Sequence, residues 1–514
     1  MTERNTSRPV QADVAVVGLG PVGALLAGLL GQRGLDVVVI EREADVFPLP
    51  RAAHIDHTGL RAVQEVGCLD AVLPSMIPNP GIDFVGLDGD LIMRLPADQS
   101  TWSGVPTSVY FHQPGFDRAL RAKLAELPNV EVRLETEVVG LESGADGVLL
   151  RTRAAGGTEE RDVRASYVVG CDGATSVVRE LTGVALEDLG FDEQWLVVDL
   201  QLDGPVPLLP PRAVYICDPA RPHVKMPMPG NRHRIEFRLL PGEDAATLQR
   251  PETVRAVLTE LIGTDAVTVE RAAVYTFHGL IAERWRDGRV LLAGDAAHQM
   301  PPFLGQGMCS GFRDATNLAW KLDHVLRRGA PDDLLDSYQE ERSPHVRQVI
   351  VRAIDYGALV GTLDPVDADA RDRQLREDHT ALLFGLPPLR PGPLVQDGGG
   401  KFFGQPPVAG QPLDDAVGNR FLVLARDERA LGETADWWRE TVGAWVTTLD
   451  ELTDPDPSLR AWFDAKGAAV AVLRPDRYLL AVTDETLDAV TARTRPLLEA
   501  AGAVPHDALD RALT

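Results

Sequence analysis

One nearly uncharged stretch, VAVVGLGPVGALLAGLLGQRG (Val14 to Gly34), constrains this chain more than any other feature. It could be a membrane anchor, a secretion signal or the phosphate-binding turn of a nucleotide-binding domain. A spanning helix needs about 20 apolar residues, whereas the apolar run from Val14 to Gly31 is shorter and contains five glycines and a proline. The polar and acidic residues before it do not supply the basic start of a signal peptide. We therefore expect neither a membrane segment nor secretion.

The same stretch has the order of a dinucleotide-binding unit. ADVAVVG predicts a buried parallel strand, and GALLAGLLGQRG predicts a helix that ends near Gly34. In the intervening turn, Gly18 permits a tight bend, Gly20 lets the backbone approach a pyrophosphate, and Gly23 allows close helix packing. A second strand, LDVVVIE, ends at Glu41, where a carboxylate would bind a ribose. A glycine turn needed only for packing is the alternative, but the complete order of elements favours dinucleotide binding.

Length and composition narrow the choices further. At 514 residues the chain exceeds the roughly 250–300 residues at which one core stops growing, so two or three domains are expected. A formal net charge of −25 disfavours nucleic acid and anionic membranes as partners, because both attract basic proteins. No CxxC pair or metal-ligand cluster is formed by the four cysteines, Cys68, Cys171, Cys217 and Cys309. We expect reduced thiols, no metal and a cytoplasmic protein.

Two further turns carry an aspartate directly after a strand. ASYVVGCDG leads into a short helix with Arg179, and GRVLLAGDAAH leads to a proline pair and a glycine-rich entry to a long helix. Such turns converge on the ligand crevice at the carboxyl ends of parallel strands. Asp172 and Asp295 could instead be helix caps. Because three such turns occur in one chain, a shared ligand site is the more economical interpretation.

The ordered set GxGxxG, DGxxSxVR (172–179) and GDAAHxMPP (294–302) resembles the group A flavoprotein monooxygenases, the para-hydroxybenzoate hydroxylase class. Flanking stretches such as PRAAHID and GQGMCSGFRDATNLAWKL are similar to the 3-(3-hydroxyphenyl)propionate hydroxylase branch, and the likeness runs from about residue 12 to beyond 485. The resemblance implies FAD, NADH or NADPH as reductant, and O₂ that is activated as a flavin C4a-hydroperoxide to hydroxylate a phenolic ring. No second GxGxxG follows a strand after residue 34, so a dedicated nicotinamide domain is not expected.

The resemblance also implies roles for individual residues. It assigns the FAD pyrophosphate to Gly18, Gly20, Pro21, Val22 and Gly23. It assigns the adenosine and ribityl portions of FAD to Glu41, Arg42, Arg51, Gln113, Val138 and Asp295. Asp172 and Arg179 would serve the pyrophosphate and the passing nicotinamide nucleotide. The isoalloxazine would lie against Pro302, Gly305, Gly307 and Met308, where amides at a helix start also stabilise a reduced flavin. The substrate wall would include Tyr215, Phe277 and Phe303.

The proton acceptor for the phenol is open at this point. His54 and Asp56, two residues apart, could form a histidine–carboxylate relay beside the flavin. Equally, Asp56 could be a helix N-cap and His54 an ordinary buried residue. His278 and Tyr215 are weaker candidates. The hydroxyphenylpropionate enzymes tend to have histidine near Phe277, tyrosine at Met308 and tryptophan at Phe303, so a different substrate, including a polycyclic phenol such as a polyketide, is allowed.

Two other functions remain open. A related flavoenzyme could insert oxygen beside a ketone (Baeyer–Villiger chemistry) or epoxidise, and a flavin-holding protein without turnover would carry the same motifs.

The expected fold class is α/β. A Rossmann-type FAD-binding domain takes residues 1–75, 102–185 and 278–385, including three short antiparallel strands between Val130 and Val169. A β-rich substrate domain takes 76–101 and 186–277, and a linker 386–412. Residues 413–514 have the β-α-β-α-β-β-α order of thioredoxin but no cysteine. We expect this unit to be structural or to support a homodimer.

Overall fold

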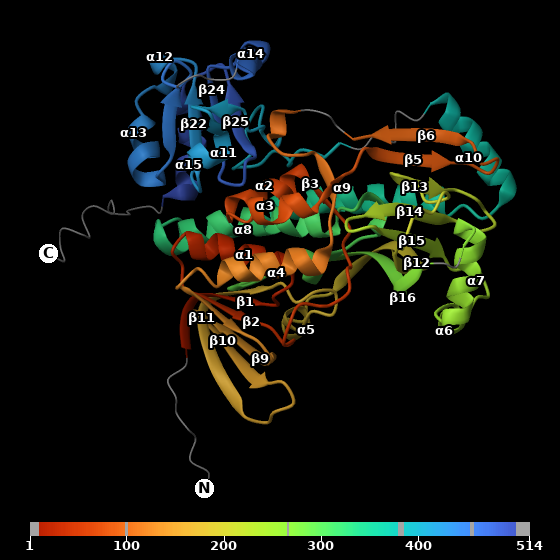
Figure 1. The fold of residues 1–514 in the computed structure, drawn as a ribbon. Coiled ribbons are helices and arrows are strands. Elements are labelled where there is room, and N and C mark those ends of the chain that lie inside the picture. Colours follow the sequence, from red (N-terminus) through yellow and green to blue (C-terminus); the bar gives the residue numbers. More distant parts are fainter. Residues whose placement is uncertain (1–9, 98–100, 265–266, 379–384, 453–456, 500–514) are drawn as a thin grey trace, which may run out of the picture.

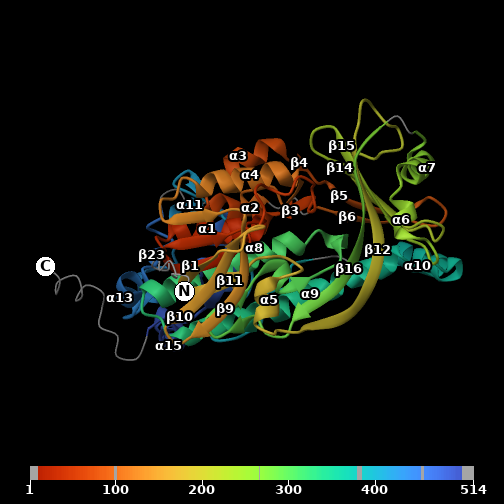
Figure 2. The same ribbon diagram turned by 90° about the horizontal axis from the view of Figure 1, so that it is seen from below.

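The computed structural model describes residues 10–97, 101–264, 267–378, 385–452 and 457–499. The fold is built on two eight-stranded sheets and a C-terminal four-stranded sheet, together with a three-stranded and a two-stranded sheet (Figures 1 and 2). The first nine and last fifteen residues, which belong to the expected first and last domains, lie outside the described ranges.

The first sheet is mainly parallel, as the apolar strand patterns predict. Its main path runs β17-β18-β11-β1-β2-β8, and β10 and β9 extend it beyond β11. The strands are β1 (Val10–Val17), β2 (Val37–Ile40), β8 (Val130–Arg133), β9 (Thr136–Gly144), β10 (Gly147–Ala154), β11 (Glu160–Gly170), β17 (Arg286–Asp287) and β18 (Val290–Leu292). Parallel pairs join β1 to β11 and β2, β2 to β8, and β11 to β18. The carboxyl ends of these strands therefore face one edge, where polar turns can meet.

Helices cover one side of these parallel strands (Figure 1). They are α1 (Pro21–Gln32), α2 (His57–Glu65), α4 (Gln113–Leu124) and α8 (Gly307–Arg327), with the short α3 (Leu69–Val72) and α5 (Val177–Leu181) nearby. A small sheet, β3 (His54–Asp56), β7 (Ser108–Tyr110) and β4 (Ile77–Pro78), lies next to α2.

One expected strand is divided in two. The segment VEVRLETEVVGLE was expected to be one of three antiparallel strands, but its first part, β8, pairs in parallel with β2. Glu135, between β8 and β9, has a φ of 51°, and this left-handed backbone ends one strand before the next begins. β9, β10 and β11 then pair antiparallel as expected.

The second sheet is strongly curved and has the order β19-β16-β12-β15-β14-β13-β5-β6 (Figure 2). Its strands are β5 (Gly81–Val85), β6 (Leu91–Pro96), β12 (Leu186–Gln201), β13 (Ala213–Ile216), β14 (His223–Met228), β15 (Arg232–Arg238), β16 (Thr268–Ala282) and β19 (His298–Gln299). The outer face packs under α6 (Ala245–Leu248) and α7 (Pro251–Ile262) through residues such as Leu196, Ile235 and Leu258. The inner face contacts α9 (Asp336–Val360), while α10 (Pro365–Glu377) lies along β6.

The C-terminal sheet has the order β23-β22-β24-β25. Its strands are β22 (Leu422–Ala425), β23 (Trp445–Thr448), β24 (Val470–Leu473) and β25 (Leu479–Thr483), and its helices include α11 (Leu413–Val417), α12 (Glu428–Leu431), α13 (Ala435–Trp437), α14 (Pro457–Lys466) and α15 (Leu487–Leu498). The four strands and the helices α14 and α15 come in the expected order. The helix expected over residues 432–442 is instead α13 followed by a π-helix, Trp438–Val442, and α11 and α12 were not expected. The thioredoxin-like assignment stays a prediction. Part of the expected linker packs into this unit, because Phe403 and Val408 are buried in its core.

Buried ion pairs join the C-terminal unit to the rest of the chain. Arg61 on α2 makes a bidentate pair with Asp414 on α11, at 2.7 and 2.8 Å. Arg474 donates to both oxygens of Glu341 on α9, at 2.8 and 2.9 Å. Since breaking a buried pair is costly, the C-terminal unit is an integral part of this structure.

Candidate active site

The GxGxxG turn has the backbone geometry that the sequence predicts. Gly18 has a φ of 100°, and a Cβ added there would lie 2.5 Å from the Cys171 carbonyl oxygen. A Cβ added at Gly23 would lie 2.0 Å from the Gly18 carbonyl oxygen. At Gly20, by contrast, nothing lies within 4 Å of an added Cβ, and no side chain caps the N-terminus of α1. The helix amides and the Gly20 backbone are therefore accessible to an anion.

Glu41 is tied to the same turn. Its carboxylate accepts hydrogen bonds from the Leu19 amide at 2.7 Å and from the Glu43 amide at 2.9 Å. Arg121 on α4 donates to the Leu19 carbonyl at 3.0 Å. The carboxylate thus lies beside the turn and in reach of a ribose attached to a pyrophosphate bound there.

The second and third polar turns are joined by Arg179. Its guanidinium donates to the Ala296 carbonyl at 2.9 Å and to the Ala174 carbonyl at 2.7 Å. Asp172 accepts from the Ser176 hydroxyl at 2.5 Å and from the Val178 amide at 3.1 Å, so it contacts the start of α5. Asp172 thus makes the helix-capping contacts that the sequence allowed as an alternative role. Arg179 links the turn that contains Ala174 to the turn that contains Ala296.

Asp295 makes no such cap. It lies in the short 3-10 turn η3 (Gly294–Ala296), where no side chain caps the turn. Its neighbours Gly294, Ala296 and Ala297 are buried, yet Asp295 itself is exposed. An exposed carboxylate held on a buried turn is free to bind a polar ligand.

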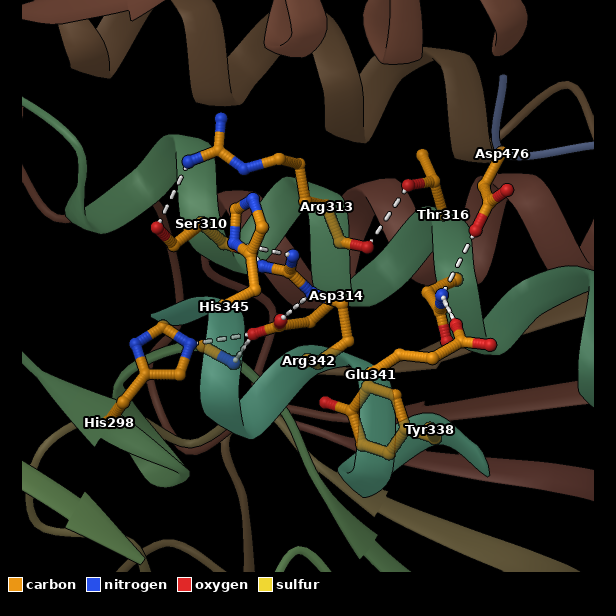
Figure 3. Close-up of polar contacts among 12 residues, drawn as sticks. His298, Ser310, Arg313, Asp314, Thr316, Tyr338, Glu341, Arg342, His345 and Asp476 are labelled. Atoms are coloured by element: carbon orange, nitrogen blue, oxygen red, sulfur yellow. Dashed lines mark hydrogen bonds and ion pairs between the residues drawn. The ribbon is translucent and has the colours of Figure 1, made fainter. Parts of the chain in front are cut away.

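A fully buried ionic network holds this turn in place (Figure 3). Asp314 on α8 accepts from His298 Nε2 at 2.7 Å, from the Gly294 amide at 3.1 Å and from Arg342 Nε at 2.9 Å. Arg342 also contacts His345 Nδ1 at 3.0 Å and donates to the Ser310 carbonyl at 3.3 Å. Burial would raise the pKa of Asp314, but His298 and Arg342 more than compensate and hold it below its usual range.

The loop 302–308 runs from η4 (Pro302–Leu304) into α8, and His54 supports it. Gly305 has a φ of 62°, and a Cβ there would lie 2.7 Å from His54 Nδ1. His54 Nδ1 lies 3.3 Å from the Gly305 carbonyl, which can only accept, so the proton is on Nδ1. Nε2 then accepts from the Ser108 hydroxyl at 2.7 Å. Burial lowers the pKa of His54, against the opposing charge of Asp56, which favours this neutral imidazole.

Asp56 is occupied by other partners. Its carboxylate accepts from the Thr58 and Gly59 amides, both at 3.0 Å, as the N-cap of α2, and pairs with Arg313 at 3.0 Å. Burial raises its pKa, but Arg313 and the helix amides lower it more, to well below the usual range. His54 and Asp56 therefore do not hydrogen-bond to each other in this structure: His54 contacts Gly305 and Ser108, and Asp56 contacts the start of α2 and Arg313.

An aromatic cluster forms the wall between loop 302–308 and the second sheet. Tyr215 donates to the Phe303 carbonyl at 2.5 Å. Phe303 is 2% exposed and packs edge-on against Trp195, with ring centroids 5.2 Å apart. Phe277 stacks on Tyr275 at the edge of this cluster, and His278 follows it on β16, half-buried.

The other expected cofactor residues are more dispersed. Gln113 accepts from the amides of Arg51 and Ala52 at 2.8 and 2.7 Å, so it fixes that backbone segment. The Arg51 side chain is exposed and lies over the Phe47 ring at 4.3 Å. Arg42 is exposed beside Glu43, while Val138 is buried on β9. Loop 302–308 ends at Gly307 and Met308, both half-buried, and Val22 packs between Gly294 and Gly311.

Several residues of the site were not anticipated from the sequence. Arg313, Asp314, Ser108 and Arg342 all orient the turns described above, and each is contacted by residues remote in the chain. The sequence gives one signal of such residues in GFRDATN, which contains Arg313 and Asp314. These two charged residues lie in a helix with a mainly apolar face, and charged side chains that are buried must find hydrogen-bond partners.

Comparison with known families agrees with this geometry. The FAD binding domain family matches residues 11–353, and the HcaD C-terminal domain family matches residues 400–496. The probable NADH-specific resorcinol 4-hydroxylase of Rhodococcus jostii (strain RHA1) is 37% identical over an alignment of 516 positions, which covers 96% of each chain. The 3-(3-hydroxy-phenyl)propionate/3-hydroxycinnamic acid hydroxylase of Klebsiella pneumoniae is 34% identical over 550 residues, also 96% of each.

Solved structures give the same result. The flavin-dependent monooxygenase PieE, in complex with FAD and substrate, superposes with a TM-score of 0.81 at 22% identity, over 96% of this chain and 100% of PieE. The OxyS anhydrotetracycline hydroxylase from Streptomyces rimosus has a TM-score of 0.77 at 26% identity, over 95% and 99% of the two chains. The chain therefore belongs to the group A flavoprotein monooxygenases and is an FAD-dependent aromatic hydroxylase. The family resemblance read from the three motifs is confirmed.

The described residues fit FAD. The open Gly20 backbone and uncapped α1 can bind a pyrophosphate, and Asp295 is exposed on a rigid turn. When bound, the flavin, reduced by a nicotinamide nucleotide, supplies the chemistry that transfers one oxygen atom from O₂ to an aromatic ring. The chain holds loop 302–308 through Tyr215 and His54, and the buried Phe303–Trp195 pair excludes water from one side of it.

No metal site or membrane span accompanies this centre in the described ranges. There, no group of three or more His, Cys, Asp or Glu side chains is arranged to hold a metal ion. None of the described helices has both the length and the apolar character that a membrane span requires. All four cysteines are free and buried.

Proposed function

We propose that this enzyme hydroxylates a small, uncharged phenol of the resorcinol type, with NADH as the reductant. The observation that carries the proposal is the charge balance on the inner face of the second sheet. Arg234 pairs with Asp199 at 2.7 Å and donates to the carbonyls of Pro50 and Arg51 at 2.8 and 2.9 Å. Arg271 pairs with the other oxygen of Asp199 at 2.9 Å.

These two buried cations are balanced within the protein by two carboxylates, because Glu236 also lies 3.8 Å from Arg234 Nη1. A substrate with a carboxylate, such as a hydroxyphenylpropionate, would need a buried cation that is free to pair with it. A neutral phenol has no such requirement. The 37% identity to a probable NADH-specific resorcinol 4-hydroxylase supports the same substrate class and the choice of NADH.

The aromatic wall favours a single ring over a polycyclic phenol. Trp195 and Phe303 are at most 2% exposed, and Tyr215 and Phe191 pack with them. Because protein interiors are close-packed, space for several fused rings would require this cluster to open.

We also propose the cofactor contacts expected from the family. The FAD ligands would be Gly18, Gly20, Pro21, Val22, Gly23, Glu41, Arg42, Arg51, Gln113, Val138, Asp172, Asp295, Pro302, Gly305, Gly307 and Met308. Of the three candidate catalytic groups, His54 is favoured over Asp56 and His278, because it contacts the Gly305 carbonyl on the loop that would carry the isoalloxazine.

The test is substrate-stimulated NADH oxidation by the FAD-loaded enzyme with resorcinol, 3-(3-hydroxyphenyl)propionate and a tetracyclic phenol, with mass spectra of the products. We expect resorcinol to gain one oxygen atom and the other two compounds to stimulate oxidation weakly. Efficient hydroxylation of the propionate, with none of resorcinol, would contradict the proposal. NADPH serves as the parallel reductant.

A further inference from the structure

Strand pairing places one acidic side chain in an otherwise uncharged row of the second sheet. Across neighbouring strands the paired residues are Ala273, Val197, Glu236, Val224 and Tyr215. Neighbouring strands are about 4.8 Å apart, so the Glu236 and Tyr215 backbones are separated by about 10 Å. Paired residues in a row share one face of the sheet, so Glu236 is on the same face as the Tyr215 side chain.

That face looks toward loop 302–308. At one end of the row, Tyr215 donates to the Phe303 carbonyl. Arg234 is two residues before Glu236 and therefore also on this face, and it donates to the Pro50 and Arg51 carbonyls. Glu236 thus lies between the contact with residues 50–51 and the contact with residue 303, which is where the wall of a substrate site is expected.

The Glu236 carboxylate has no hydrogen-bond donor within the described chain. The residue is only 6% exposed, and its nearest cation, Arg234 Nη1, is 3.8 Å away and already donates to the Arg51 carbonyl. Burial raises the pKa of Glu236, opposed by Arg234. A buried carboxylate that has a cation at 3.8 Å but accepts no hydrogen bond is costly, and natural proteins rarely leave such a group unsatisfied.

We propose that Glu236 accepts a hydrogen bond from a phenolic hydroxyl of the substrate, and that it thereby orients the ring toward loop 302–308 and disfavours carboxylated phenols. The inference rests on the proposed function. A phenolic hydroxyl supplies the donor that Glu236 lacks, whereas a substrate carboxylate would place two like charges together in a buried site. Glu236 is therefore a specificity residue of the aromatic hydroxylase.

The test compares the FAD-loaded wild type with Glu236→Gln and the matched control Glu193→Gln. Glu193 is on the same sheet, but it already pairs with Arg238 at 2.9 Å and accepts from Trp195 Nε1 at 3.0 Å. Dissociation constants are measured from the flavin fluorescence on titration with resorcinol, 3-methoxyphenol and 3-hydroxybenzoate. FAD content and thermal unfolding are recorded for each variant, so that a folding defect is recognised.

We expect Glu236→Gln to weaken resorcinol binding by about fivefold or more, because a hydrogen bond to a neutral amide oxygen is weaker than one to a carboxylate. It should bind 3-hydroxybenzoate more tightly than the wild type does, a gain that misfolding cannot produce. Glu193→Gln should leave both constants within about twofold of the wild type. If a folded Glu236→Gln variant bound resorcinol and 3-hydroxybenzoate with the wild-type affinities, the inference about Glu236 would be overturned and the proposed function would stand. No response of the wild type to resorcinol would overturn the proposed function and this inference with it.

Discussion

Asp314→Asn should destabilise the cofactor-binding part of the enzyme far more than its conservative size suggests. Asp314 accepts three hydrogen bonds, from His298, Gly294 and Arg342, and both Asp314 and Arg342 are fully buried. An asparagine can accept at one position only, so its NH₂ group would face a donor. Arg342 would also remain as a buried cation without its carboxylate, which typically costs about 3–5 kcal/mol.

The assay is thermal unfolding followed by the release of flavin fluorescence. For a cooperative unit of 150–250 residues each kcal/mol lowers Tm by about 2–4 °C, so we expect a loss of at least about 6 °C. FAD affinity should fall as well, because Asp314 holds the Gly294 amide and His298 on either side of Asp295.

Asp336→Asn is the matched control for this prediction. Asp336 pairs with Arg286 at 2.7 Å but is 61% exposed, and such surface pairs contribute at most about 1 kcal/mol. A Tm for Asp314→Asn no lower than that of Asp336→Asn would refute the argument that the buried network holds the Asp295 turn.

Three further substitutions test other parts of the site. Glu41→Ala should weaken FAD binding by about 1.5–3 kcal/mol, the usual loss for hydrogen bonds to a charged group, and an unchanged titration of the apoprotein with FAD would leave Glu41 a purely structural role. His54→Ala should keep FAD and be reduced by NADH, but hydroxylation should fall by about 10² or more if His54 accepts the phenolic proton, and peroxide should rise; normal product yield per NADH would clear His54 of that role. Burial raises the pKa of Asp117 to about 6, so folding stability is lost progressively as the pH rises from about 4, where the unfolded carboxyl ionises, to about 6, and nothing is lost near pH 2, where the group is protonated in both states. Asp117→Asn should therefore raise the free energy of unfolding at pH 8 by up to about 3 kcal/mol, seen as a higher Tm, and an equal gain near pH 2 would contradict the cause.

The sequence predicts the local parts of the site well, because their signals are short. The GxGxxG turn needs only a strand, three glycines and a helix, and the structure gives Gly18 and Gly23 the tight contacts that exclude larger residues. The Asp56 cap is likewise visible in Asp-His-Thr, since a cap bonds amides two and three residues later.

Contacts between distant segments are harder to predict. The strand HRIEFRLL alternates, so the sequence places Ile235 and Phe237 on one face and Arg234 and Glu236 on the other. A polar face normally indicates solvent. Here it is buried, because Arg234 contacts the carbonyls of Pro50 and Arg51 and Tyr215, on the same face, contacts the Phe303 carbonyl, and both contacts join segments that are remote in the chain.

Loop 302–308 joins the cofactor side and the substrate side of the site into one mechanical unit. Three different segments hold adjacent parts of it: Tyr215 from the second sheet binds the Phe303 carbonyl, His54 from the small sheet binds the Gly305 carbonyl, and Arg313 from α8 donates to the Gln306 side chain at 2.8 Å. Close-packed interiors transmit displacements because they have little free volume. We therefore expect a ligand that shifts the sheet row containing Tyr215 also to shift this loop, and with it a flavin ring that lies against the loop.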